Sequence, residues 1–173
     1  MKAEFEQIAQ WLQPEGIYVD VALNDSMHAL EFIATAIARH HGLEPDPVFR
    51  ALWRREQAGS TALGAGFSIP HARIPGIDRP LTLLLRAARP IAFKAPDREP
   101  VWLMLAILVP EQGDKQDHLE LLALVAELFS DPMFRARMDT DKDPAGLARA
   151  FRTGVARLRG CRRPEASDQG TKR

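Results

Sequence analysis

The sequence has a single cysteine, Cys161, among its 173 residues. One cysteine can form neither an internal disulfide nor a thiolate cluster for a metal, so we expect a reducing, cytoplasmic environment. The chain also lacks an excess of charge of either sign, because 23 lysines and arginines balance 23 aspartates and glutamates. Proteins that bind nucleic acid or membrane surfaces usually carry a basic excess. We therefore expect neither nucleic acid nor a membrane among the partners.

Long hydrophobic runs are missing too. The longest, Val101–Val109, is far shorter than the roughly 20 residues that a membrane-spanning helix needs. Residues 1–10 mix charged and apolar side chains and contain no signal-peptide core. We therefore expect a soluble protein without membrane insertion and, if it serves a transport system, not the permease of that system.

Hydrophobic periodicity predicts a sheet with helices on both sides. Apolar residues alternate over Ile17–Leu23, which is the period of a half-buried strand. Further extended segments are predicted over Leu81–Ala88, Ile91–Phe93 and Val101–Val109. The last is apolar at odd and even positions alike, which is typical of a strand covered on both faces. We expect an α/β fold, a three-layer α/β/α sandwich around a small mixed sheet.

Aspartates mark most of the predicted helix starts. Asn24-Asp25-Ser26 opens a segment with one apolar face, which Gly42 ends. Three other starts carry an Asp-Pro pair, with the aspartate as N-cap and the proline as first helical residue; these are Asp46-Pro47, Asp131-Pro132 and Asp143-Pro144. A weaker periodicity predicts a helix within Met1–Gln13, and the closing helix is expected to run to about Arg157.

The chain is expected to form one domain with a tail. Its length suits one domain with a sizeable core. From Gly160 onward the residues are polar and charged, with almost nothing to bury. We therefore predict a single domain over residues 1–159 and a disordered tail over residues 160–173.

A capping box places a histidine at the start of one long helix. Asp117 as N-cap and Glu120 three residues later fit the box, which would make His118 the first helical residue. A helix amino terminus offers free N–H groups and the positive end of the helix dipole, so His118 could meet an anion there. The residues alone favour an ordinary surface position instead.

The most informative stretch is Gly59–Arg73, with the sequence GSTALGAGFSIPHAR. It combines three glycines, two adjacent hydroxyls and a histidine, His71, directly after a proline. Glycine permits close backbone approaches and proline fixes φ, so His71 is presented in one direction. Arg55 upstream and the closing arginine of the stretch suit an anion. A glycine-rich turn with an idle, exposed histidine explains the stretch equally well, because such loops are weak signals when they stand alone.

The chain resembles the enzyme IIA domains of the bacterial phosphotransferase system, of the fructose, mannitol and nitrogen-regulatory types. The matching residues are Arg55-Glu56, Gly59-Ser60-Thr61, Gly64, Gly66, Ile69-Pro70-His71, Val109-Pro110-Glu111 and His118-Leu119. The resemblance spans roughly residues 17–151 and implies the mannitol-type enzyme IIA fold. One departure is a turn: the family often has Asp-Gly before the long apolar strand, where this chain has Asp97-Arg98-Glu99.

The resemblance implies a phosphorylated histidine. In that family the histidine of the Pro-His pair accepts a phosphoryl group from the carrier HPr or its nitrogen-branch relative, which makes His71 the acceptor here. It also implies that His118 is the second histidine beside the acceptor, placed to bind phosphoryl oxygens or to stabilise the loop. Imidazole is nucleophilic near neutral pH and forms a phosphoramidate.

The remaining candidate residues would support that chemistry, since phosphoryl transfer depends mostly on positioning and electrostatics. We assign Arg55 to the phosphoryl charge or to the loop, with Glu56 pairing with it or orienting it. The hydroxyls of Ser60 and Thr61 would bind the oxygens or fix the ring. Arg73 is a further basic candidate that could instead meet an acidic partner. This chemistry requires neither a metal nor another cofactor.

We predict a phosphocarrier of the phosphoenolpyruvate-dependent phosphotransferase system, of the nitrogen-regulatory type. Its phosphorylation state would regulate partners such as sensor kinases and potassium transporters, and the lack of a IIB or IIC segment in the chain favours this type. One alternative is a sugar-specific IIA that passes phosphate to the IIB domain of a fructose or mannitol permease. Another is a docking module of the same fold whose His71 is never phosphorylated. A hydrolase or metal enzyme would need a ligand set that is missing around the two histidines.

Overall fold

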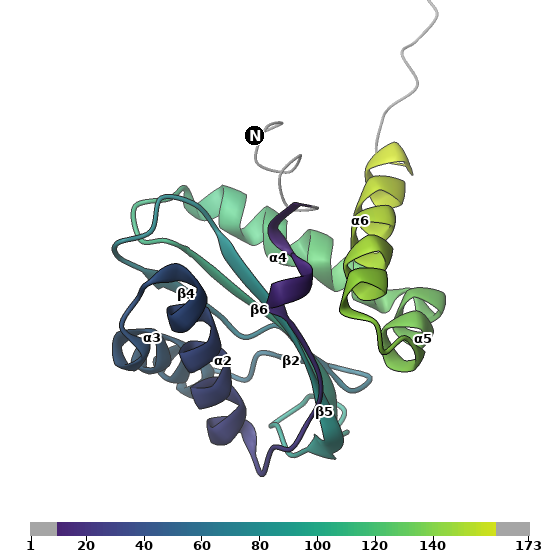
Figure 1. Ribbon diagram of the computed structural model, residues 1–173, viewed down its shortest axis with the longest axis horizontal. Coiled ribbons are helices and arrows are strands. Elements are labelled where there is room, and N and C mark those ends of the chain that lie inside the picture. Colours follow the sequence, from purple (N-terminus) through teal and green to yellow (C-terminus); the bar gives the residue numbers. More distant parts are fainter. Residues whose placement is uncertain (1–9, 162–173) are drawn as a thin grey trace, which may run out of the picture.

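The computed structural model describes residues 10–161 and places one mixed sheet between two layers of helices (Figure 1). In chain order the elements are η1 (Pro14–Gly16), β1 (Ile17–Val21), α2 (Ser26–His41), α3 (Pro45–Gln57), β2 (Ala62–Gly64), β3 (Phe67–Ser68), β4 (His71–Ile74), β5 (Leu81–Ile91), β6 (Val101–Pro110), α4 (Lys115–Ser130), α5 (Pro132–Thr140) and α6 (Pro144–Cys161). Gln10 and Trp11 are helical, and most of the helix predicted over Met1–Gln13 lies outside the described residues. No helix in the described range is both long and apolar enough to cross a membrane.

Strand β6 is the centre of the sheet. The strands follow the order β1-β5-β6-β3-β2, and β4 also pairs with β6. β5 runs antiparallel to β6, whereas β3 and β4 run parallel to it and β1 runs parallel to β5. The predicted mixed sheet is therefore confirmed.

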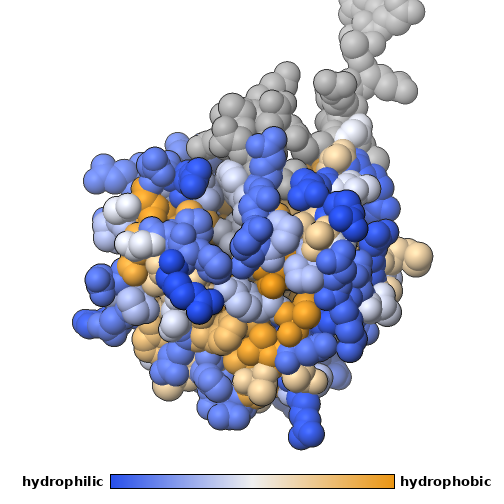
Figure 2. Space-filling model, in the orientation of Figure 1, coloured by the Kyte–Doolittle hydropathy of each residue, from blue (hydrophilic) through white to orange (hydrophobic). Residues whose placement is uncertain are grey.

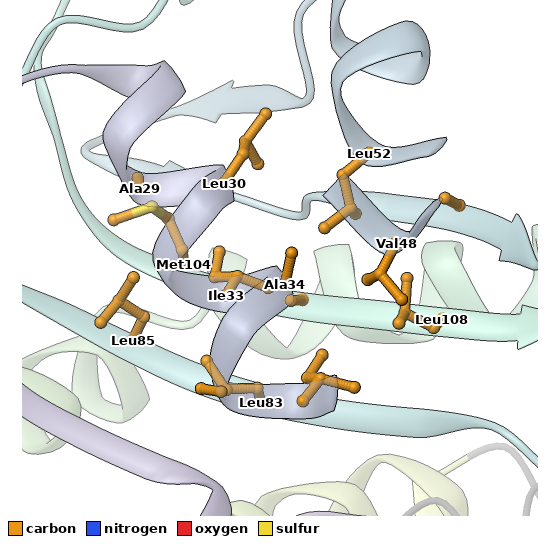
Figure 3. Close-up of a cluster of buried hydrophobic side chains, with 14 of the residues drawn as sticks. Ala29, Leu30, Ile33, Ala34, Val48, Leu52, Leu83, Leu85, Met104 and Leu108 are labelled. Carbon is orange, nitrogen blue, oxygen red and sulfur yellow. The ribbon is translucent and has the colours of Figure 1, made fainter. Parts of the chain in front are cut away.

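Two hydrophobic clusters lie on the two faces of the sheet. Alternate residues of β6 enter each: Met104 and Leu108 belong to the cluster under α2 and α3, and Leu105 and Ile107 to the cluster under α4, α5 and α6. Figure 3 shows the first cluster, in which Leu83 and Leu85 of β5 lie below Ile33 and Ala34 of α2. The predicted three-layer sandwich is thus confirmed. On the face shown in Figure 2, hydrophilic side chains surround a limited hydrophobic area.

Most predicted helix caps are present. The carboxylates of Asp25, Asp131 and Asp143 each accept backbone N–H groups of the following turn, and Gly42 ends α2 with a φ of 66°. The Asp46 cap is wrong, because α3 begins at Pro45 with Glu44 in the N-cap position. Pro45 offers the same fixed φ at the first helical position.

Two further boundaries differ from the predictions. Helix α4 begins at Lys115 behind the N-cap Asp114, so the capping box at Asp117 is wrong. Helix α6 continues past Arg157 to Cys161, so the first two residues of the predicted tail are helical. The rest of that tail, residues 162–173, lies outside the described residues.

The glycine-rich stretch forms short strands, not a continuous loop. Strands β2 and β3 make a tight hairpin in which Gly66 has a φ of 79°, and a Cβ atom there would lie 2.2 Å from Nε1 of Trp102. Glycine is therefore required at this position by both conformation and space. The hairpin leads through Ile69 and Pro70 into β4, whose first residue is His71.

Candidate functional site

His71 is held by the central strand and by two hydrogen bonds to its ring. It opens β4 and pairs with Ile107 of β6. Its Nδ1 lies 2.7 Å from the carbonyl oxygen of Ile69. Because a carbonyl only accepts, Nδ1 carries the ring proton and Nε2 keeps its lone pair. Arg55 donates from Nε to that Nε2 at 2.9 Å.

Arg55 connects three parts of the site. It lies in the last turn of α3, and besides the His71 ring its Nη1 binds the carbonyl oxygen of Gly59 at 2.8 Å. The guanidinium therefore holds both the ring and the start of the glycine-rich stretch. Its position places a positive charge beside the Nε2 lone pair of His71.

Glu56 binds the loop and not its neighbour Arg55. Its Oε2 accepts from the backbone N–H of Thr61 at 3.0 Å and from the Thr61 hydroxyl at 2.6 Å. The Thr61 oxygen also lies 3.0 Å from the hydroxyl of Ser68, and Thr61 is buried. The expected pairing of Glu56 with Arg55 is absent from the described contacts. Glu56 and Thr61 instead form a partly buried brace beneath the site.

Ser60 has a more exposed position. Its Oγ accepts the backbone N–H of Ala62 at 3.2 Å, and the residue lines the cleft over His71. The hydroxyl hydrogen stays available for donation, since the oxygen is used as an acceptor. Of the two adjacent hydroxyls, Ser60 is thus the one that can reach a group in the cleft.

His118 lies beside His71 although 46 residues of sequence separate them. The two ring centroids are 5.4 Å apart, with the rings tilted by 53°. The N–H of His118 is bonded to Asp114, and the Asp114 carboxylate takes the N–H groups of Gln116 and Asp117. The N–H groups of Gln116, Asp117 and His118 are therefore already bonded within the protein. The histidine contributes its ring, whose Nδ1 is buried without a hydrogen-bond partner among the described residues.

Both rings are neutral at pH 7. Burial, and then the charges of His71, Arg73 and Arg55, lower the pKa of His118 to about 4. Burial also lowers the pKa of His71; the Ile69 carbonyl opposes this shift and the Arg55 charge adds to it. A neutral His71 keeps its Nε2 lone pair, which is the state that nucleophilic attack requires.

Arg73 is occupied by backbone carbonyl groups. Its Nη1 donates to the carbonyl oxygens of Glu111 and Gly113 at 3.0 and 2.9 Å, and its Nη2 donates to that of Asp114 at 3.0 Å. These bonds cross from β4 to the loop before α4. Arg73 lines the cleft but is fixed on the protein itself.

An open cleft of about 700 Å³ joins these residues. All the predicted site residues except Glu56 line it, and its other wall is apolar. Two leucines are exposed on this wall, Leu119 at 59% and Leu63 at 49%. Residues 10–161 contain no group of three or more acidic, histidine or cysteine side chains suited to a metal ion.

Comparison with known proteins identifies the family. The model of the family described as "Phosphoenolpyruvate-dependent sugar phosphotransferase system, EIIA 2" matches residues 10–153. The nitrogen regulatory protein of Bradyrhizobium diazoefficiens is 35% identical over 140 residues, which is 81% of this chain and 91% of that protein.

Solved structures agree with this assignment. Nitrogen regulatory protein IIA-Ntr from Neisseria meningitidis superposes with a TM-score of 0.79 at 30% identity, over 83% of this chain and 98% of that one. Enzyme IIA-Mtl of Escherichia coli, solved in complex with phosphorylated enzyme IIB-Mtl, superposes with a TM-score of 0.67 at 16% identity, over 81% of this chain and 96% of that one. The second likeness shows the fold alone, and it confirms the predicted one. This chain belongs to the EIIA 2 family of the phosphoenolpyruvate-dependent sugar phosphotransferase system, in its nitrogen-regulatory branch.

Proposed function

We propose that His71 accepts and releases the phosphoryl group of this phosphocarrier, and that Nε2 is the bonding atom. The observation that supports this most directly is the hydrogen bond from Nδ1 of His71 to the Ile69 carbonyl oxygen, at 2.7 Å. It leaves the lone pair on Nε2, which faces the cleft beside Arg55 and His118. A lone pair held in one direction, next to positive charge, suits attack on phosphorus.

The transfer step needs no external base. The Nε2 lone pair of His71 forms the new N–P bond, the N–P bond of the donor phosphohistidine breaks, and that electron pair returns to the donor nitrogen. Throughout, the proton stays on Nδ1 of His71, which donates it in a hydrogen bond to the Ile69 carbonyl oxygen. Arg55 has to turn away from Nε2 before attack, and its guanidinium then meets the phosphoryl oxygens that take its place. Ser60 and the His118 ring supply further donors from either side of the cleft.

The donor in this proposal is HPr or a nitrogen-branch relative, and the protein acts in the cytoplasm. The exposed apolar wall with Leu63 and Leu119 gives such a carrier a surface to dock on. Phosphorylation adds about two negative charges beside this wall. We infer that partners such as sensor kinases or potassium transporters distinguish the two states by this charge. The nitrogen-regulatory names of the relatives support regulation over sugar transport.

Intact mass measured at neutral pH tests the proposal. The protein is incubated with phosphoenolpyruvate, enzyme I and HPr, or with the nitrogen-branch counterparts, and an acid-labile gain of one phosphate is expected. His71→Gln should abolish the gain and keep the folded circular dichroism spectrum. His118→Gln, the matched control, should still accept phosphate but release it more slowly to an acceptor. Labelling of the His71 variant would refute the assignment of the site.

Two further outcomes separate the alternatives. Lack of any gain with either donor pair would favour the docking module. A rapid passage of phosphate from this protein to a fructose or mannitol IIB domain would favour the sugar-specific role, for which the solved IIA–IIB complex of the mannitol system is a precedent. The regulatory proposal predicts slow transfer to both IIB domains.

A further inference from the structure

Arg73 lies on the same side of β4 as His71. Between them and after them, Ala72 and Ile74 are buried in the cluster under α2 and α3. Because side chains alternate along a strand, His71 and Arg73 both face α4. Two residues of one short strand thus point at the helix that carries His118.

One carbonyl oxygen joins Arg73 to His118. The Asp114 oxygen accepts Nη2 of Arg73 at 3.0 Å and the backbone N–H of His118 at 3.3 Å. The same guanidinium holds the carbonyls of Glu111 and Gly113 through Nη1. The Arg73 side chain is therefore linked to the backbone of His118 through one shared acceptor, the Asp114 carbonyl oxygen.

The loop that carries these carbonyls has few other attachments. Residues 111–114 are exposed. Two backbone hydrogen bonds attach them to the end of the sheet, from the N–H of Glu111 to the Ile74 oxygen at 3.0 Å and from the N–H of Gly113 to the Pro110 oxygen at 3.1 Å. The three guanidinium bonds thus join β4 to three of the four residues of the loop that leads into α4.

We propose that Arg73 is a positioning residue, whose guanidinium clamps loop 111–114 so that the His118 ring stays opposite His71 during phosphoryl transfer. The role rests on the proposed function, and it differs from the binding of phosphate or of an acidic partner. A planar guanidinium can serve three carbonyls at fixed angles, whereas a lysine ammonium carries the same charge as a single point. A positioning role and a charge-binding role therefore predict different effects of Arg73→Lys.

The first test uses the unphosphorylated full chain. Arg73→Met removes the donors and keeps much of the aliphatic stem, Arg73→Lys keeps the charge, and Arg89→Met removes an exposed arginine of β5 as a control. Amide hydrogen exchange at His118 should be at least about tenfold faster in Arg73→Met, and the proton contact between the two imidazole rings should weaken. Arg73→Lys should show both changes to a lesser degree and Arg89→Met neither. Unchanged exchange and ring contact in Arg73→Met would overturn the proposal.

The second test measures transfer kinetics. In Arg73→Met the catalytic rate of phosphoryl transfer should fall about tenfold or more, since displaced groups cost rate, while KM for the donor stays unchanged. A loss confined to KM and fully restored by Arg73→Lys would instead assign Arg73 to docking by charge and overturn the clamp. If the wild-type chain took no phosphate at all, the proposed function would fail, while exchange and ring contact would still decide the clamp.

Discussion

The two histidines of the cleft differ in what fixes their protonation. His71 has a partner for each ring nitrogen, the Ile69 carbonyl and Arg55, so its tautomer is set by contacts. His118 has a buried Nδ1 without a described partner, and its neutral state follows from burial and from nearby positive charge. Protonation of His118 would place a cation among His71, Arg55 and Arg73. Both imidazole rings are therefore neutral at pH 7, and His71 is the proposed phosphoryl acceptor.

This difference predicts an acid sensitivity. The folded pKa of His118, about 4, lies below its ordinary value of 6.5, so between these pH values the unfolded chain binds a proton that the folded chain does not. The contribution of His118 to the free energy of unfolding should thus fall as the pH drops from 6.5 to 4, and it should stay constant below pH 4. Histidine-ring NMR should give a titration midpoint near 4, and His118→Gln should make urea-unfolding free energies less dependent on pH in this window. A midpoint near 6.5 would contradict the burial argument.

Helix α4 begins one turn earlier than the sequence suggested, before the histidine that it brings to the cleft. The carboxylate of Asp114 accepts the N–H groups of Gln116 and Asp117 at 2.6 and 3.3 Å, so Asp114 is the N-cap. His118 then lies inside the first turn, where its N–H is already bonded. The ring of His118 lies beside that of His71, and Leu119 lies on the open wall of the cleft.

Two neighbouring alanine substitutions test this register. Asp114→Ala removes the cap and should lower the free energy of unfolding by about 1 kcal/mol. Asp117→Ala, its matched control, removes a carboxylate that caps nothing and should cost only a few tenths of a kcal/mol, by its interaction with the helix dipole. Urea unfolding followed by circular dichroism compares the two. A larger loss of unfolding free energy in Asp117→Ala than in Asp114→Ala would instead support the capping box at Asp117 that the sequence suggested.

A buried arginine joins the sheet to the helical layer of α5 and α6. Arg86 of β5 is only 4% exposed. Its Nη1 donates to the carbonyl oxygens of Met138, Asp139 and Asp141, at 2.9, 2.8 and 2.8 Å. These carbonyl groups lie at the carboxyl end of α5. The Nη2 of Arg86 lies 3.3 Å from a carboxylate oxygen of Asp20 in β1. One side chain thus holds the end of α5 against two strands of the sheet.

Removal of this arginine should destabilise the whole molecule. Arg86→Met leaves several carbonyl groups without their donor, and we expect a loss of about 3 kcal/mol in the free energy of unfolding. The exposed Arg89→Met should change it by less than about 0.5 kcal/mol. Phosphate acceptance by the folded fraction should be normal in both variants, because Arg86 lies outside the cleft. A wild-type unfolding midpoint for Arg86→Met would show that the brace contributes little.

Local patterns were enough to predict the layers and to single out His71 as a candidate residue. The apolar run Val101–Val109 predicted a strand buried on both faces, and Asp25, Asp131 and Asp143 predicted helix starts. Both predictions succeeded because periodicity and capping depend on residues that are close together in the sequence. The Pro-His pair and the glycines around it likewise identified His71 as the residue presented by a constrained backbone.

The contacts that give each side chain its task depend on packing between distant segments. The bond from Arg55 to His71, the brace from Glu56 to Thr61 and the bonds from Arg73 to loop 111–114 form only when α3, β4 and α4 meet around the sheet. No local pattern specifies which carbonyl a guanidinium will reach across 40 residues. The sequence therefore singled out the candidate residues. The assembled layers gave Glu56 and Arg73 supporting bonds, because their partners came within hydrogen-bonding distance there.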